Sequence, residues 1–200
     1  MPSPFETERL ALRPFSKADV DKLCELDSDP DVMRFLNGGV ATPREVIRTR
    51  ILPWFMSFDR DCAGLGFWAA HEKASGDFIG WFELHPEEGR DPDELALGYR
   101  LRRKFWRKGY ATEGSRALIG RAFRELGARR VFAAAYSENL ASRGVLEKCG
   151  MRAARTYRAI ADDMPATYVA SDAVFPSDDI EYVLDRGDWA RAAAIASRPD

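Results

Sequence analysis

Residues 106–114 read WRKGYATEG, and this stretch decides how the rest of the chain is interpreted. Residues 94–102 before it have the pattern of a strand, and residues 112–126 after it place apolar side chains at helical spacing. Two cations, Arg107 and Lys108, therefore stand directly before a helix. The free N–H groups and partial positive charge of a helix N-terminus favour anions. The residues alone leave two interpretations open, a basic turn or an anion-binding loop.

The glycine in this stretch adds a second indication of ligand binding. Gly109 lets the backbone approach a ligand closely or adopt a positive φ, and Thr112 offers a hydroxyl group. One glycine is a weaker signal than a complete phosphate-binding motif. The pattern GxxxxGK[ST] is absent, which argues against a nucleoside-triphosphate hydrolase.

Composition narrows the class of protein. The chain has 200 residues, of which 46% are hydrophobic and 31% charged, as expected for a globular protein with a core. The net charge of −2 argues against a nucleic-acid partner. Three widely spaced cysteines without a CxxC pair indicate reduced thiols and no metal site. No apolar signal sequence and no uncharged membrane-spanning stretch is present, so we expect a cytoplasmic protein without a membrane partner.

Periodicity along the chain predicts a single α/β (α+β) domain over residues 1–200, with a mixed sheet flanked by helices. We expect residues 188–200 to form a surface helix or a frayed tail. A capping box at Thr42 predicts a helix that Pro53 kinks or ends. The expected strands are 9–15, 67–71, 78–84, 94–102, 131–136, 152–159 and 179–184; the other expected helices start at Ser16 and Asp29 or span 112–126 and 140–149.

Four segments together resemble the GNAT superfamily of acetyl-CoA-dependent N-acetyltransferases. They are TERLALRP at 7–14, LGYRL at 97–101, WRKGYATE at 106–113, and the unit from Asn139-x-x-Ser142 to Gly150-Met151. They occur in the family's order, and the likeness spans residues 7 to about 185. Within the superfamily, the chain is most similar to the RimJ/RimL type, which acetylates the N-termini of ribosomal proteins.

The resemblance implies how acetyl-CoA, the co-substrate, binds. Strands 94–102 and 131–136 of a mostly antiparallel sheet should splay apart to admit the pantetheine arm, which pairs with backbone near Leu101 and Arg103. Asn139 and Ser142 match positions near the thiol end, although Asn139 also suits a helix N-cap and Ser142 a solvent-facing first turn. The residues implied to hold the pyrophosphate are Arg107, Lys108, Gly109, Tyr110, Ala111 and Thr112.

The chain also departs from the family pattern where catalysis is concerned. Arg107 replaces a frequent glycine, and Leu146 stands where many members have a tyrosine general acid; the RimJ/RimL type uses the serine, here Ser142. Ala96 occupies a position that is often glutamate; the nearest carboxylates, which are the candidates for a general base, are Glu94, one strand repeat away on the same face, and Glu83 on the neighbouring strand. The resemblance thus implies three catalytic candidates, while His71 and His85 are expected to be ordinary strand or surface residues. The catalytic set is Ser142, Glu83 and Glu94.

The implied reaction is direct acetyl transfer to a primary amine. The acceptor would be a peptide N-terminus or a small amine, bound in a groove between residues 33–58 and the strand of Glu83, with Trp54, Phe55 and Trp81 as its lining. Two alternatives remain open, a non-catalytic acyl-CoA-binding or sensor module and an unrelated nucleotide-binding α/β protein. The sequence leaves the oligomeric state open, a homodimer included.

Overall fold

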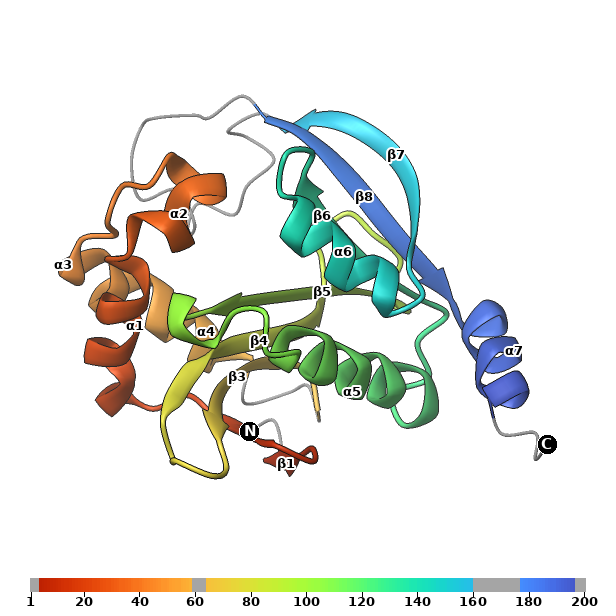
Figure 1. The fold of residues 1–200 in the computed structure, drawn as a ribbon, viewed down its shortest axis with the longest axis horizontal. Coiled ribbons are helices and arrows are strands. Elements are labelled where there is room, and N and C mark those ends of the chain that lie inside the picture. The colour runs from red at the N-terminus through yellow and green to blue at the C-terminus, as the bar shows by residue number, and fades with distance from the viewer. Residues whose placement is uncertain (1–3, 59–63, 160–176, 197–200) are drawn as a thin grey trace.

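The computed structural model describes residues 4–58, 64–159 and 177–196 (Figure 1). Eight strands form one sheet in the order β1-β2-β3-β4-β5-β6-β8-β7, and every neighbouring pair is antiparallel except β5–β6. The strands are β1 (Phe5–Glu6), β2 (Leu10–Pro14), β3 (Gly66–Glu72), β4 (Phe78–Pro86), β5 (Glu94–Leu101), β6 (Arg130–Tyr136), β7 (Arg152–Ala159) and β8 (Ser177–Asp185). This mixed, mostly antiparallel sheet was predicted.

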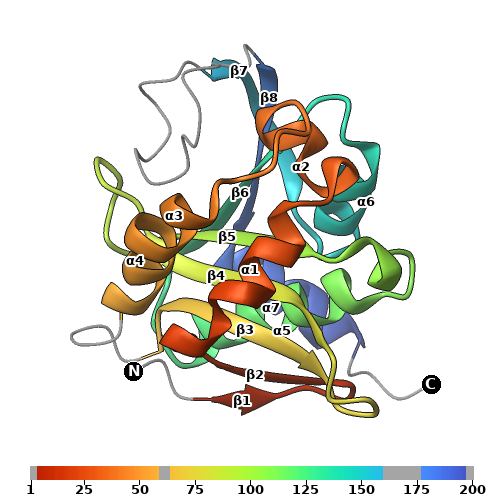
Figure 2. The same ribbon diagram turned by 90° about the vertical axis from the view of Figure 1, so that its left-hand side faces the viewer.

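Helices cover both faces of the sheet (Figure 2). The early helices pack on one face around Leu23, Ile47 and Phe67, and α5 and α6 pack on the other. The helical elements are η1 (Lys17–Asp19), α1 (Val20–Asp27), α2 (Pro30–Asn37), α3 (Arg44–Val46), the π-helical turn η2 (Ile47–Ile51), α4 (Leu52–Ser57), η3 (Arg103–Phe105), α5 (Tyr110–Arg124), α6 (Leu140–Lys148) and α7 (Arg186–Ala196).

The helix over residues 44–57 corrects two local expectations. The N-cap is Pro43, without a side-chain cap hydrogen bond, so Thr42 does not form the predicted capping box. The helix also continues through Pro53 to Ser57, so of the two alternatives expected for the proline, a kink or an end, the end is wrong. Just before the proline, the N–H of Leu52 donates to the carbonyl of Ile47 in a wide π turn. A proline leaves one upstream carbonyl without its usual donor, and a π turn is a common site for that irregularity.

The C-terminal helix packs against α5, and the described cysteines are free thiols. The terminal helix α7 begins at Arg186, and its Trp189 packs against Phe123 of α5 with the rings tilted and their centroids 5.4 Å apart. Cys24 and Cys149 are free thiols, whereas Cys62 lies outside the described residues. The described ranges contain neither a helix suited to crossing a bilayer nor a cluster of three or more metal-ligating side chains.

Candidate functional site

The central strands diverge, as predicted. β5 and β6 pair in parallel only from Glu94 to Ala96, opposite Arg130 to Phe132. Beyond this point β5 continues to Leu101 paired with β4 alone, and β6 continues to Tyr136 paired with β8 alone. Beyond these pairs, the facing edges of β5 and β6 are therefore not hydrogen-bonded to each other. A ligand with its own amide groups could pair with these edges.

The basic loop leads directly into α5. The helix starts at Tyr110, two residues earlier than predicted, and Gly109 is its N-cap in the left-handed region at φ 84°. Arg107 has φ 59° and is the one non-glycine residue with positive φ in the described part of the chain. The loop thus keeps a glycine-like conformation where the family often has glycine, although an arginine stands there. Such a conformation costs a non-glycine residue about 1–2 kcal/mol.

The N-terminal segment braces this loop. Glu113 in the first turn of α5 accepts hydrogen bonds from the Thr7 hydroxyl (2.5 Å), the Arg9 backbone N–H (2.8 Å) and the Arg9 side-chain Nε (2.6 Å). The Arg9 guanidinium also donates to the Lys108 carbonyl at 2.9 Å and lies 4.6 Å from the centroid of the Tyr110 ring. Two of the family-like sequence segments, about a hundred residues apart, are therefore in direct contact, and one fixes the backbone of the other.

The backbone near Leu101 and Arg103 is held by a tryptophan. The Trp106 indole N–H donates to the Leu101 carbonyl at 2.7 Å, and the Trp106 backbone N–H donates to the Arg103 carbonyl at 3.0 Å. The Arg103 guanidinium pairs with Asp31 of α2 at 2.5 Å. These contacts set the shape of the segment between β5 and the basic loop, and they tie it to the early helices.

Ser142 lies on the α5–α6 side of the opening. Asn139 is the N-cap of α6, and its side chain accepts from the Ser142 N–H at 3.1 Å, so its expected capping role is confirmed. The Ser142 Oγ lies 3.0 Å from the Tyr99 hydroxyl of β5. Burial raises the pKa of Tyr99 to about 12, so the phenol is protonated at neutral pH. Leu146 is buried in the core and brings no polar atom to this region.

Glu83 lies on the other face of the sheet. It pairs with Gly98 across β4–β5, and a Cβ added at Gly98 would collide with the Glu83 carboxylate. The carboxylate therefore covers the β5 backbone two residues beyond the last β5–β6 pair. Its side chain is 16% exposed, so it remains open to a solute.

Glu94 has a different environment at the start of β5. Its carboxylate contacts Arg129 at 2.8 Å, Arg130 at 3.6 Å and Arg90 at 3.7 Å. Three guanidinium groups contact the Glu94 oxygens, so this carboxylate is already engaged in ion pairs and an acceptor amine would have to displace them. Of the two carboxylates expected from the sequence, the geometry favours Glu83 as a base.

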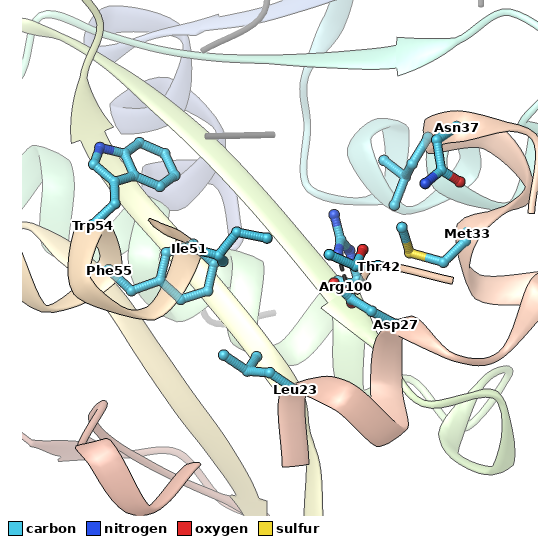
Figure 3. A pocket seen from close by; sticks show the side chains of 10 residues that line it. Leu23, Asp27, Met33, Asn37, Thr42, Ile51, Trp54, Phe55 and Arg100 are labelled. Atoms are coloured by element: carbon cyan, nitrogen blue, oxygen red, sulfur yellow. Dashed lines mark hydrogen bonds and ion pairs between the residues drawn. The ribbon is translucent and has the colours of Figure 1, made fainter. Parts of the chain in front are cut away.

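A small cavity lies where the acceptor groove was expected (Figure 3). Its volume is about 20 Å³, which is room for about one water molecule. Asp27 and Arg100 form a buried ion pair in its wall at 2.6 Å. Trp81 does not line it and instead lies in the core beneath the Arg100 guanidinium. The lining residues are Leu23, Asp27, Met33, Leu36, Asn37, Thr42, Ile51, Trp54, Phe55 and Arg100.

Sequence reasoning missed Tyr99, His85 and the Asp27–Arg100 pair. His85 is 7% exposed and lies within β4, so of the two alternatives expected for it, a surface or a strand residue, it is a strand residue. The sequence signal for His85 is its spacing of two residues from Glu83, which puts both side chains on one face once the strand predicted over 78–84 is extended by one residue. No signal could have paired Asp27 with Arg100, since they lie 73 positions apart on different elements.

Comparisons with known proteins agree with this geometry. A family model for the acetyltransferase (GNAT) domain matches residues 9–152. The chain is 31% identical over 194 residues to the FsC-acetyl coenzyme A-N(2)-transacetylase of Aspergillus fumigatus, covering 94% of this chain and 78% of that protein. A GNAT-family acetyltransferase from Bacillus anthracis has a similar structure, with a TM-score of 0.72 at 24% identity over 92% of this chain and 99% of that one.

The aminoglycoside acetyltransferase AAC(6')-Ib, solved in complex with coenzyme A, is also similar, with a TM-score of 0.70 at 17% identity over 92% of this chain and 99% of that one. The diverging strands, the glycine-capped basic loop before α5 and the family match over residues 9–152 lead to one conclusion. This chain belongs to the GNAT family of acetyltransferases.

Proposed function

We propose that this acetyltransferase transfers the acetyl group of acetyl-CoA directly to a primary amine. Acetyl-CoA, the co-substrate of the family, supplies a thioester whose carbonyl carbon accepts the amine. Family membership identifies the protein as an acyltransferase and removes the unrelated nucleotide-binding alternative. It also makes a non-catalytic acyl-CoA sensor the weaker interpretation, which a coenzyme A release assay with a panel of amines tests directly.

One observation carries this proposal: two candidate catalytic groups flank the β5 backbone at successive residues. Neighbouring residues of a strand point to opposite faces of the sheet. Glu83 covers Gly98 on the face of the early helices, and Tyr99 reaches Ser142 on the face of α5 and α6. An amine could therefore lose a proton on one face while the departing sulfur accepts a hydrogen bond from the other.

The basic loop would hold the pyrophosphate of acetyl-CoA. The N–H groups of the first turn of α5 have no partner within the helix, and Arg107 and Lys108 add positive charge beside them. Each charge-assisted contact would contribute about 1.5–3 kcal/mol. The fit is supported by the conformation of the loop, because Gly109 at φ 84° leaves no side chain over the helix end.

The backbone of β5 offers a donor for the carbonyl oxygen. Arg102 donates its N–H to the Ile79 carbonyl of β4 at 2.8 Å. Since the hydrogen-bonding direction alternates along a strand, the N–H of Tyr99 faces away from β4, toward the opening. We assign to it the role of stabilising the negative charge that develops on the carbonyl oxygen.

Ser142 would assist the leaving group. When the Tyr99 phenol donates to the Ser142 Oγ, the serine proton is free to donate a hydrogen bond to the departing thiolate. The parent pKa of a thiol is about 8.5, so the thiolate needs assistance but not full protonation in this step. Ser142 is therefore a catalytic residue in this proposal, and Tyr99 positions it.

For the acceptor, we place a peptide N-terminus first, in keeping with the likeness to the RimJ/RimL type. An α-amine has a pKa of about 7.7–8.0, so a carboxylate such as Glu83 needs to give only modest help. A small amine is the second candidate. It is supported by the similarity to a protein named as an aminoglycoside acetyltransferase.

A substrate panel separates these acceptors. We would compare kcat/KM for short peptides with free N-termini, the same peptides blocked at the N-terminus but carrying lysine, polyamines and amino acids. Peptides with free N-termini should be the best substrates. A preference for polyamines or amino acids would support the second candidate. Blocked lysine peptides as the best substrates would refute N-terminal acetylation and keep the enzyme class.

The remaining expectations about partners and location stay predictions. They are a cytoplasmic location, a homodimer and the absence of nucleic-acid and membrane partners. Light scattering after size-exclusion chromatography measures the mass of the assembly, and cell fractionation measures the location.

A further inference from the structure

A second titratable side chain lies directly behind Glu83. His85 follows it by two residues on β4, so both side chains leave the same face of the sheet. Across β4–β5, His85 is paired with Ala96, whose methyl group brings no polar atom. The mechanism described above gives this imidazole no role.

His85 is enclosed by aromatic rings from two other elements. Its ring centroid lies 5.9 Å from that of Trp54, 4.8 Å from that of Phe58 and 5.3 Å from that of Phe67. The side chain is 8% exposed, against 16% for Glu83. Glu83 is therefore the more exposed of the two side chains, and His85 lies behind it among the aromatic rings.

The hydrogen bonds of the ring determine its protonation. The Nδ1 atom lies 2.9 Å from the Pro86 carbonyl oxygen, which can only accept, so Nδ1 carries a hydrogen. The Nε2 atom lies 3.5 Å from Oε2 of Glu83. In the neutral ring Nε2 would then present a lone pair to a carboxylate, which is repulsive. A proton held by Nε2 turns the contact into an attractive one.

The charges around His85 support this uptake of a proton. Among the described residues, the charged groups that act on the ring are Glu83 and Glu87, and α4 and β3 contribute the apolar rings of Trp54 and Phe67. Burial lowers the pKa of His85, but the hydrogen bond and charge of Glu83 outweigh it, so the pKa is raised. Arg90, 3.5 Å from Glu87, offsets part of the second carboxylate.

We propose that His85 takes up, through Glu83, the proton that the acceptor amine loses during acetyl transfer. This inference rests on the proposed function. The neutral amine attacks the thioester carbonyl carbon: the C–N bond forms, the C–S bond breaks with its electron pair on sulfur, and the proton released by the now positively charged nitrogen passes to the Glu83 carboxylate and on to Nε2 of His85. Glu83 is thereby left ionised. The active enzyme has a neutral His85, because a ring that is already protonated has no place for the proton.

Proton NMR tests the coupling between His85 and Glu83 without any turnover. The chain has two histidines, so a His71→Gln and a His85→Gln variant assign both ring signals. His85 should titrate above 6.5, and Glu83→Gln should shift its pKa downward. His71 is the internal control: burial and the charges of Arg13 and Lys22 lower its pKa, and Glu83→Gln should leave it unchanged. If the pKa of His85 is unchanged in the Glu83→Gln variant, the proposal is overturned.

The pH dependence of kcat/KM tests the role in catalysis. Two protons must be lost before reaction, one from the amine and one from His85, so log kcat/KM should rise with a slope of 2 at low pH. In His85→Gln the slope should fall to 1, and kcat/KM at pH 8 should drop about 10- to 100-fold. The glutamine amide still donates to Glu83, so a purely structural role would leave the slope unchanged. His71→Gln should keep both the slope and the rate.

The outcomes separate this inference from the proposed function. A slope of 2 in His85→Gln, or a kinetic pKa that differs from the NMR value of the free enzyme, would refute the role of His85 while acetyl transfer stands. If His85→Gln does not fold, Glu83→Gln in the wild-type background still reports the coupling by NMR. A wild-type protein that releases no coenzyme A with any primary amine would refute the proposed function itself, and the role of His85 in turnover with it.

Discussion

Arg107 offers a test in which stability and ligand affinity separate. The residue adopts φ 59°, which costs a side-chain-bearing residue about 1–2 kcal/mol. Arg107→Gly relieves that strain, but the freedom of glycine in the unfolded chain returns about 0.5–1 kcal/mol. We therefore expect Arg107→Gly to be more stable than Arg107→Ala, which keeps the strain, by about 0.5–1 kcal/mol. For a chain of this size, that difference raises Tm by about 1–4 °C.

Relative to the parent, both variants should bind acetyl-CoA more weakly, although Arg107→Gly should be the more stable of the two. Both variants lose one charge-assisted contact to the pyrophosphate, about 1.5–3 kcal/mol, so Kd should rise about 10- to 150-fold in each. Because Arg107 is exposed, the loss should be largest at low ionic strength and shrink with added salt. Titration calorimetry at two salt concentrations gives Kd, and scanning calorimetry gives Tm.

Two results would refute this reasoning about Arg107. If Arg107→Gly and Arg107→Ala melt at the same temperature, the loop conformation carries no strain. If both variants bind acetyl-CoA as tightly as the parent, the guanidinium does not contact the pyrophosphate. Arg107→Lys serves as the matched control, because it retains the charge and the strain while losing the planar fork.

Three further predictions concern the acid side of the site, the loop and the dependence of stability on pH. Ser142→Ala should lower kcat about 10-fold or more with little change in the Kd of acetyl-CoA, and Tyr99→Phe should add little to the loss in Ser142→Ala, which a double-mutant cycle of kcat measures. Gly109→Val should weaken acetyl-CoA binding more than Gly109→Ala in calorimetry, since a β-branched residue is a severe outlier at positive φ, while circular dichroism should show both folded. Burial raises the pKa of Asp19, but hydrogen bonds from groups that include Arg13 outweigh it and hold the pKa well below its usual range. The stability that Asp19 contributes should therefore be complete above the unfolded pKa of about 3.9 and be lost as pH falls below it. Urea unfolding measures the free energy of unfolding at pH 5 and at pH 2.5. The difference between these two values should be smaller for Asp19→Asn than for the parent.

The order of the helices and strands could be predicted because local patterns encode it. The basic loop was located from residues 106–114, whereas its role in anion binding and the divergence of β5 and β6 followed from the family likeness. The start of α5 was placed two residues late, because the left-handed Gly109 acts as a cap without a capping side chain. The continuation of the helix through Pro53 could not be read from the chain, since a neighbouring π turn accommodates the proline.

The choice of base is the part of the site that needed the fold. Glu83 and Glu94 look equivalent in the sequence, as carboxylates on adjacent strands near Ala96. The structure surrounds Glu94 with three arginines and places Glu83 against Gly98, in contact with a buried His85. Ion pairs between residues far apart in the chain leave no periodic signal, so no local pattern could distinguish the two carboxylates.

The sequence by itself therefore determined the family, the sheet with its helices, and the loop that precedes α5. The family was identified from the likeness of four segments, whereas the sheet, the helices and the loop rest on hydrophobic periodicity, helix capping and glycine conformation, which act over a few neighbouring residues. Tertiary structure alone decided the contact of Arg9 with Glu113, the hydrogen bond between Tyr99 and Ser142, and the burial of His85 behind Glu83. Those contacts arise only when strands and helices that are distant in sequence pack together, because the strength of each depends on the desolvation that packing brings.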